Sequence, residues 1–313
     1  MPHVTFIHGI GNKPEAEELH RIWLRSLADG GLGLVDEGVT SSLVYWADVL
    51  YPEPDRDVAA FESVVESRPE GVDAAGGATA PAAETPEERA FLEGLRGKLT
   101  VVPPGAAAAP DAEALDAAPE AGRLPLERVP LPWALKERFL ETFLRDVHAY
   151  LFDIEVSPRP GTTYRVQQEI RERFVNALGA PAITSPHIVV SHSMGTVVAY
   201  DCLKRVGGCP RVDALVTIGS PLGIDEIQDK LRPEWRRHDG FPSLTVMGAW
   251  VKVADPLDVV CGPDPKLAND FRQDGRAVVN DQRVANGGWW RHAIVRYLRQ
   301  PALQRELGAL LGF

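Results

Sequence analysis

The chain has 313 residues, 44% of them hydrophobic, and a formal net charge of −11, which argues against nucleic acid or an anionic membrane as its main partner. Its three cysteines, Cys202, Cys209 and Cys261, are too few and too scattered for a disulfide framework or a zinc site. No secretory signal is visible and no apolar run reaches the ~18 residues of a membrane span, so we expect a cytoplasmic protein without a transmembrane segment, of unknown oligomeric state.

An apolar run of strand length, His3-Val4-Thr5-Phe6-Ile7-His8, leads directly into the glycine turn Gly9-Ile10-Gly11. Such a turn could cradle phosphate, but the G-x-G-x-x-G spacing of dinucleotide-binding folds is absent. An amphipathic helix is expected over 15–27, and a second strand over 43–48.

The composition then changes over about 52–160, a block that interrupts the alternation of strands and helices. Its segments of about 68–86 and 103–123 have few aromatic or β-branched residues, which is typical of flexible chain. Helices are expected over 87–99 and about 131–152, the second with apolar residues at every fourth position. We interpret the block as an insertion into a single domain, either a cap over the active site or an inert solvent-facing elaboration.

After the insertion, the alternation of apolar patterns resumes. It predicts a helix over 164–178, a strand at Ile188-Val189-Val190, a helix over 195–206, strands over 212–218, 244–253 and 277–279, and helices over 291–299 and 303–310. Gly219-Ser220-Pro221 ends one of these strands. An α/β fold with about six strands follows from this pattern.

Ser191-His192-Ser193-Met194-Gly195 lies between the β-branched strand and the helix that follows it. A strand, a sharp turn and a helix with serine at the apex fit the nucleophile elbow, here as S-x-S-x-G in place of G-x-S-x-G. The backbone of such a turn is strained, and the neighbours two positions away must be small, as Ser191 and Gly195 are. The alternative interpretation of Ser193 is an ordinary serine that caps a helix.

The elbow, the His-Gly turn, a late aspartate and a later histidine together resemble the lipase and esterase branch of the α/β-hydrolase superfamily, over residues 1–50 and about 160–300. The resemblance implies a compact, mostly parallel sheet with helices on both faces and a helical, cap-like insertion. It places the first strand between the second strand and the elbow strand. Lipase-like chains often carry a Gly-Ser-Pro like Gly219-Ser220-Pro221, which implies a loop beside the site. The resemblance also implies an oxyanion hole made by the backbone N–H groups of Ile10 and Met194.

In this superfamily an acid and then a histidine follow the serine. A predicted strand runs into Asp255-Pro256-Leu257-Asp258, where either aspartate could serve. We favour Asp258, because in lipase-like sequences a β-branched residue often follows the acid closely, and we expect Asp255 to bind loop N–H groups. Of the remaining histidines, His238 precedes the acid in a charged stretch, whereas His292 follows it after a glycine loop and is the predicted general base.

The resemblance therefore implies a serine hydrolase that cleaves carboxylic esters, with Ser193, His292 and Asp258 as its triad and a small-molecule or lipid-like ester as its substrate. The same triad could serve a thioesterase, an amidase or an acyltransferase, and a non-catalytic binding module is the alternative of another class. No cofactor is expected, and no metal-binding motif occurs in the sequence. Trp289 and Trp290 either line the acyl site or belong to the core.

Overall fold

The computed structural model describes residues 1–56, 83–100, 133–180, 185–231, 239–287 and 290–313. The two segments predicted to be flexible, 68–86 and 103–123, lie outside the described residues except for 83–86, and so do His238 and Trp289.

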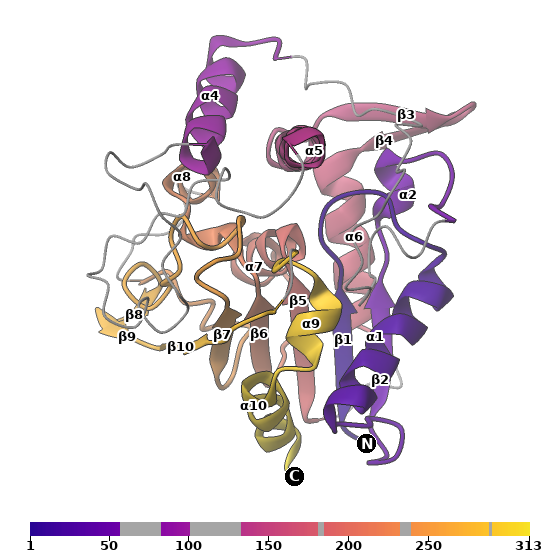
Figure 1. The fold of residues 1–313 in the computed structure, drawn as a ribbon, viewed down its shortest axis with the longest axis vertical. Helices are drawn as coiled ribbons and strands as arrows, with labels where there is room; N and C mark the ends of the chain where they lie inside the picture. Colours follow the sequence, from indigo (N-terminus) through magenta and orange to yellow (C-terminus); the bar gives the residue numbers. More distant parts are fainter. Residues whose placement is uncertain (57–82, 101–132, 181–184, 232–238, 288–289) are drawn as a thin grey trace.

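Six parallel strands form one sheet in the order β10-β7-β6-β5-β1-β2 (Figure 1). They are β1 (His3–Ile7), β2 (Thr40–Val44), β5 (His187–His192), β6 (Ala214–Ile218), β7 (Trp250–Ala254) and β10 (Val279–Arg283). The strand β1 lies between β2 and β5, as expected. The prediction of an α/β-hydrolase fold with a compact, mostly parallel sheet is therefore confirmed.

Helices cover both faces of this sheet. On one face lie α1 (Ala16–Gly30), α9 (Ile294–Leu298) and α10 (Pro301–Leu311), and on the other lie α6 (Val166–Leu178) and α7 (Met194–Arg205). Successive strand residues point to opposite faces of the sheet. Val4 and Phe6 of β1 therefore pack in the core under α1, α9 and α10, whereas Ile7 packs in the core under α6 and α7. Every residue of β1, β5, β6 and β7 is buried, as expected for parallel strands covered on both sides.

The insertion contributes helices and a hairpin at the end of the sheet where β1 and β5 lead into the site (Figure 1). The remaining elements are α2 (Ala47–Leu50), α4 (Pro86–Thr100), α5 (Trp133–Leu151), the antiparallel pair β3 (Glu155–Arg159) and β4 (Thr162–Arg165), the 3-10 helix η3 (Pro221–Gly223), α8 (Asp225–Leu231), β8 (Arg272–Gln273) and β9 (Arg276–Ala277). Among the helices of the described residues, none is both long and apolar enough to cross a membrane.

The second strand begins earlier than predicted, at Thr40. Thr40, Ser41 and Ser42 form a polar run that gives no strand signal, but this edge strand satisfies its hydroxyls through tertiary hydrogen bonds. Thr40 and Ser42 bond to the ring nitrogens of His3 at 2.8 and 3.0 Å. Local propensity is overridden here by the neighbouring strand.

Other boundaries also differ from the prediction. The strand β7 starts at Trp250, not at residue 244, and β10 spans Val279–Arg283, not 277–279. Tyr164 and Arg165 pair with β3 in the hairpin, so α6 begins at Val166. The hairpin and α8 were not predicted, because both are short and neither carries a long apolar period.

Candidate active site

Ser193 lies between the end of β5 and the start of α7, with φ +54° and ψ −130°. A positive φ is unfavourable for a residue with a side chain and persists only where the surrounding structure enforces it. Here the Ser193 N–H donates to the carbonyl of Ile218 at 2.9 Å, which ties the turn to β6. The side chain is held at the carboxyl edge of the sheet in the backbone geometry of a nucleophile elbow.

Gly195 is required by a close approach of two backbones. A Cβ atom there would lie 2.5 Å from the carbonyl oxygen of His8 and 2.8 Å from that of Ile7. The N-terminus of α7 therefore packs directly on the end of β1. On the other side of Ser193, the Ser191 hydroxyl donates to the Val216 carbonyl at 3.0 Å.

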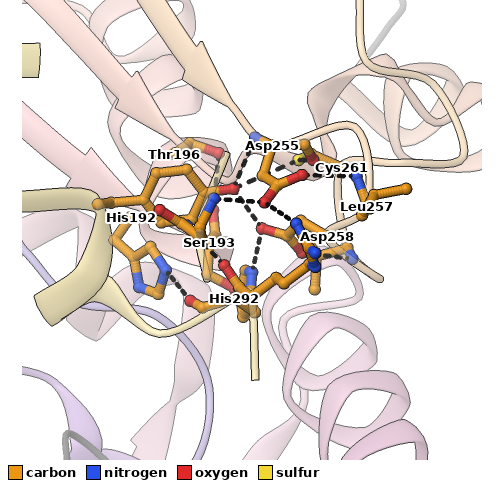
Figure 2. Close-up of polar contacts among 12 residues, drawn as sticks. His192, Ser193, Thr196, Asp255, Leu257, Asp258, Cys261 and His292 are labelled. Carbon is orange, nitrogen blue, oxygen red and sulfur yellow. Dashed lines mark hydrogen bonds and ion pairs between the residues drawn. The ribbon is translucent and has the colours of Figure 1, made fainter. Parts of the chain in front are cut away.

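The structure brings the three predicted triad side chains into one line (Figure 2). His292 Nε2 lies 2.9 Å from Ser193 Oγ, and His292 Nδ1 lies 2.8 Å from Asp258 Oδ2. The ionised Asp258 carboxylate can only accept, so Nδ1 carries the imidazole proton and Nε2 is free to accept the serine proton. All three side chains are buried.

Asp258 is held as an anion by several donors. Burial alone would raise its pKa, but the charge and hydrogen bond of His292, with further bonds from Tyr297 and Val260, lower the pKa of Asp258 below its ordinary value. The Val260 N–H donates to Oδ1 at 2.8 Å. The carboxylate is thus available to orient and stabilise a histidine cation.

Asp255, the alternative acid, faces a different set of partners. Its Oδ2 accepts the Asn286 N–H at 2.7 Å and a guanidinium hydrogen of Arg291 at 3.1 Å, and its Oδ1 accepts the Leu257 N–H at 2.8 Å. Burial raises the pKa of Asp255 above its ordinary value, and these donors oppose that shift. Asp255 therefore ties the loop after β7 to the segment that carries His292, and Asp258 is the carboxylate at the imidazole.

The His-Gly turn lies against Ser193. A Cβ atom at Gly9 would lie 2.5 Å from the Ser193 Cβ and 3.1 Å from its Oγ. Across the described ranges of the chain, the N–H groups of Ile10 and Met194 donate to no protein acceptor. Two unused amide donors next to a serine hydroxyl are the kind of group that an oxyanion hole requires.

His8 fixes the conformation of this turn. The Trp46 N–H donates to His8 Nε2 at 2.9 Å, so the proton of the ring lies on Nδ1, which donates to the Gly9 carbonyl at 2.8 Å. The Trp46 ring stacks on the imidazole at 4.7 Å. Complete burial, with a smaller contribution from the charge of Lys13, lowers the pKa of His8 to about 3. The ring is therefore neutral at physiological pH.

The insertion reaches the same turn through α5. The fully buried carboxylate of Asp146 accepts the Gly11 N–H at 2.8 Å and the Tyr51 hydroxyl at 3.0 Å, and it pairs with Arg145 at 2.7 Å. Sequence reasoning missed Asp146, because it lies in a helix of the insertion with no motif around it.

Gly219, in the predicted loop beside the site, lies against the side chains of Asp258 and His292. Its φ is +54°, and a Cβ atom there would lie 3.0 Å from Asp258 Oδ2 and 3.2 Å from His292 Nδ1. A larger residue would therefore press on the bond between histidine and aspartate.

Aromatic rings lie over the imidazole. Phe139 of α5 meets His292 edge to face at 6.0 Å between ring centroids, and it meets Trp290 in the same way at 4.9 Å. Below the imidazole, His192 Nε2 donates to the His292 carbonyl at 3.0 Å. The histidine is therefore fixed through both its ring and its backbone.

The chain matches no protein-family model and no curated protein. Among solved structures it is similar to acetyl xylan esterase 1 from Thermoanaerobacterium sp. JW/SL YS485, with 12% identity and a TM-score of 0.35 over 99% of this chain and 74% of that one. A TM-score this low establishes neither a shared fold nor a shared activity.

The arrangement contains the parts that nucleophilic catalysis requires: a strained serine, a base that can take its proton, an acid that orients the base, and unused amide donors beside the hydroxyl. Within the residues that the structure describes, no group of three or more His, Cys, Asp or Glu side chains could hold a metal ion.

Proposed function

We propose that this chain is a serine hydrolase that cleaves carboxylic esters. The observation that carries the proposal is the continuous line from Ser193 Oγ through His292 to Asp258, at 2.9 and 2.8 Å. A buried serine at positive φ, bonded to a histidine that bonds a carboxylate, is costly to maintain and has no evident purpose in packing.

In the proposed reaction, the Ser193 hydroxyl attacks the ester carbonyl while His292 Nε2 takes its proton. Asp258 stabilises the imidazolium, and the N–H groups of Ile10 and Met194 bind the carbonyl oxygen as it becomes an anion. The imidazolium then protonates the departing alcohol and leaves an acyl-serine. A water molecule, deprotonated by His292, attacks the acyl group and releases the acid and the free serine.

The insertion is proposed to act as a cap that covers this site. Phe139 of α5 lies over His292, and Asp146 of the same helix holds the turn that carries Ile10. These contacts favour the cap over an inert elaboration. Phe139 and Trp290 together place aromatic rings next to the reacting atoms, which suits an apolar acyl or alcohol group.

The direct test is the Ser193→Ala variant assayed with p-nitrophenyl acetate. We expect at least a thousandfold loss of turnover, because removal of a triad nucleophile leaves only residual catalysis. Ser191→Ala is the matched control: this serine lies two positions away on β5 and its hydroxyl bonds only to a backbone carbonyl, so turnover should persist. Turnover of Ser193→Ala at the wild-type level would refute the proposal.

Labelling by a fluorophosphonate probe separates an enzyme from a non-catalytic binding module. The wild type should form a stable adduct at Ser193, and Ser193→Ala should form none. A panel of activated esters, thioesters and amides with one acyl group then identifies the preferred leaving group. The proposal predicts that the ester is cleaved with the highest kcat/KM.

A further inference from the structure

Tyr297 is a buried residue of α9 that no part of the proposed reaction uses. Its side chain is fully buried, and its hydroxyl lies 2.6 Å from Asp258 Oδ2, the oxygen that also bonds His292. Nothing in the sequence around Tyr297 indicates this contact, because α9 is a short helix whose apolar residues pack in the core.

The direction of this hydrogen bond is fixed by its surroundings. The Asp255 N–H donates to the phenol oxygen at 3.0 Å, so the single phenol proton is left for the Asp258 carboxylate. Burial, with the nearby charge of Asp258, raises the pKa of Tyr297 well above its ordinary value. The phenol is therefore protonated at neutral pH and acts as the donor in this bond.

We propose that Tyr297 is a positioning residue of the triad, which holds Asp258 in the rotamer that faces His292 and shares the charge of Oδ2 between two donors. The inference rests on the proposed function, because it assigns Tyr297 a part in the same proton transfer. Without the phenol, Oδ2 would have His292 as its only side-chain donor, and its full charge would act on the imidazole.

Two consequences follow for the reaction. The carboxylate would lose one of three bonds that fix its orientation, so proton transfer from Ser193 would slow. The stronger field at the imidazole would let His292 keep a proton up to a higher pH, where it cannot act as a base.

Other ionisable groups also lie around Tyr297 and Asp258, and removal of the phenol oxygen alone leaves these groups in place. They are His292, His192, Cys261, Asp255 and Lys252.

The test is Tyr297→Phe, which removes one oxygen atom and keeps the ring. We expect kcat to fall about tenfold with little change in KM, and the acid limb of the pH profile of kcat/KM to move up by about half a pH unit, since one charge-assisted bond is lost. Site-specific 3-fluorotyrosine, a stronger donor of nearly the same shape, should move the limb down. An unchanged limb in both proteins would overturn the inference.

Tyr150→Phe is the matched control. Tyr150 is also fully buried and donates to a buried carboxylate, Asp201, at 2.6 Å. It should lose similar stability but keep the wild-type pH profile. A shifted profile in this control would contradict a specific role of Tyr297.

A double-mutant comparison shows whether Tyr297 acts through Asp258. In an Asp258→Asn background, Tyr297→Phe should lower kcat less than twofold, because the two changes remove the same interaction. A full tenfold loss in that background would overturn the inference.

The NMR signal of the His292 Nδ1 proton tests the inference independently of turnover. Tyr297→Phe should shift this signal, and Tyr150→Phe should not. If the wild type cleaves no ester and takes no fluorophosphonate, the proposed function fails. A shifted Nδ1 signal in Tyr297→Phe would still support the positioning role of Tyr297, and an unshifted signal would overturn it.

Discussion

The two sides of the candidate site are stabilised in different ways. On the acid side, the Asp258 carboxylate accepts three hydrogen bonds and the Asp255 carboxylate accepts three more, all from residues 257–297. On the oxyanion side, where the oxyanion hole is proposed, the turn after β1 offers backbone N–H groups. That turn is held by the neutral ring of His8 and, through Gly11, by Asp146 of the insertion.

This difference indicates which changes each side tolerates. The acid side is a closed network of buried charge, so loss of one partner leaves another unpaired. The oxyanion side depends on a residue from a separate helix and on a histidine that must stay uncharged. We expect turnover to be most sensitive to substitution of Asp258 itself, and the stability of the fold at low pH to be sensitive to the state of His8 on the oxyanion side.

The largest expected effect comes from exchanging the two aspartates for asparagine. Asp258→Asn should lower kcat about 10³- to 10⁴-fold, because the amide cannot hold His292 in the required tautomer. Asp255→Asn should lower kcat less than about tenfold but reduce the free energy of unfolding by about 1–3 kcal/mol, because it breaks the bonds to Arg291 and Asn286. Ester assays and urea unfolding measure the two effects, and equal losses of kcat would contradict the assignment of the acid.

An intermediate effect is expected at Asp146. In Asp146→Asn, one acceptor oxygen becomes a donor, so Gly11, Tyr51 and Arg145 cannot all be satisfied and the turn that carries Ile10 loosens. We expect kcat to fall about tenfold with KM little changed, because the Ile10 N–H would then be less well placed to bind the oxyanion.

Glu88→Gln is the control for this variant. Glu88 joins α4 to α5 through His148 at 3.2 Å, away from the turn. It should leave kcat within about twofold of the wild type, as expected for an interaction outside the site. If Glu88→Gln is as slow as Asp146→Asn, general loosening of α5 explains both results.

The smallest effect concerns pH and His8. Because the pKa of His8 in the folded chain is about 3 and its ordinary value is 6.5, the unfolded chain binds more protons between these values, and stability falls as pH falls through this window. His8→Asn should lower the slope of unfolding free energy against pH by up to about 1.4 kcal/mol per unit between pH 6 and 5. Urea unfolding at several pH values measures this slope. Equal slopes for the wild type and His8→Asn would refute the expectation.

The sequence predicted the parts of the site that depend on local pattern. The strand, turn and helix around Ser193 are specified by β-branched residues and by the small neighbours that the turn requires. Chain order then selected His292 over His238 and narrowed the acid to two aspartates. The structure places these side chains together, and their catalytic roles stay predictions until the variants are assayed.

The rest could not be predicted because it depends on tertiary contacts alone. Thr40 and Ser42 belong to a strand because β1 pairs with this segment, and His3 of β1 also bonds their hydroxyls. Asp146 and Tyr297 reach the site from helices whose own apolar patterns would be the same with any polar residue at those positions. Such residues are invisible to motif reasoning until the fold brings them to the site.

The place of β1 between β2 and β5 in the sheet has a consequence for biosynthesis. Thr5 and His187 are hydrogen-bonded neighbours on adjacent strands, yet they are 182 positions apart in the chain. While the ribosome makes the intervening residues, β1 has only β2 beside it, and its other edge lacks its native partner. A nascent chain that stops before β5 would expose an apolar edge, so release of incomplete chains should lead to aggregation, and chaperones that shield such edges should raise the yield of folded protein.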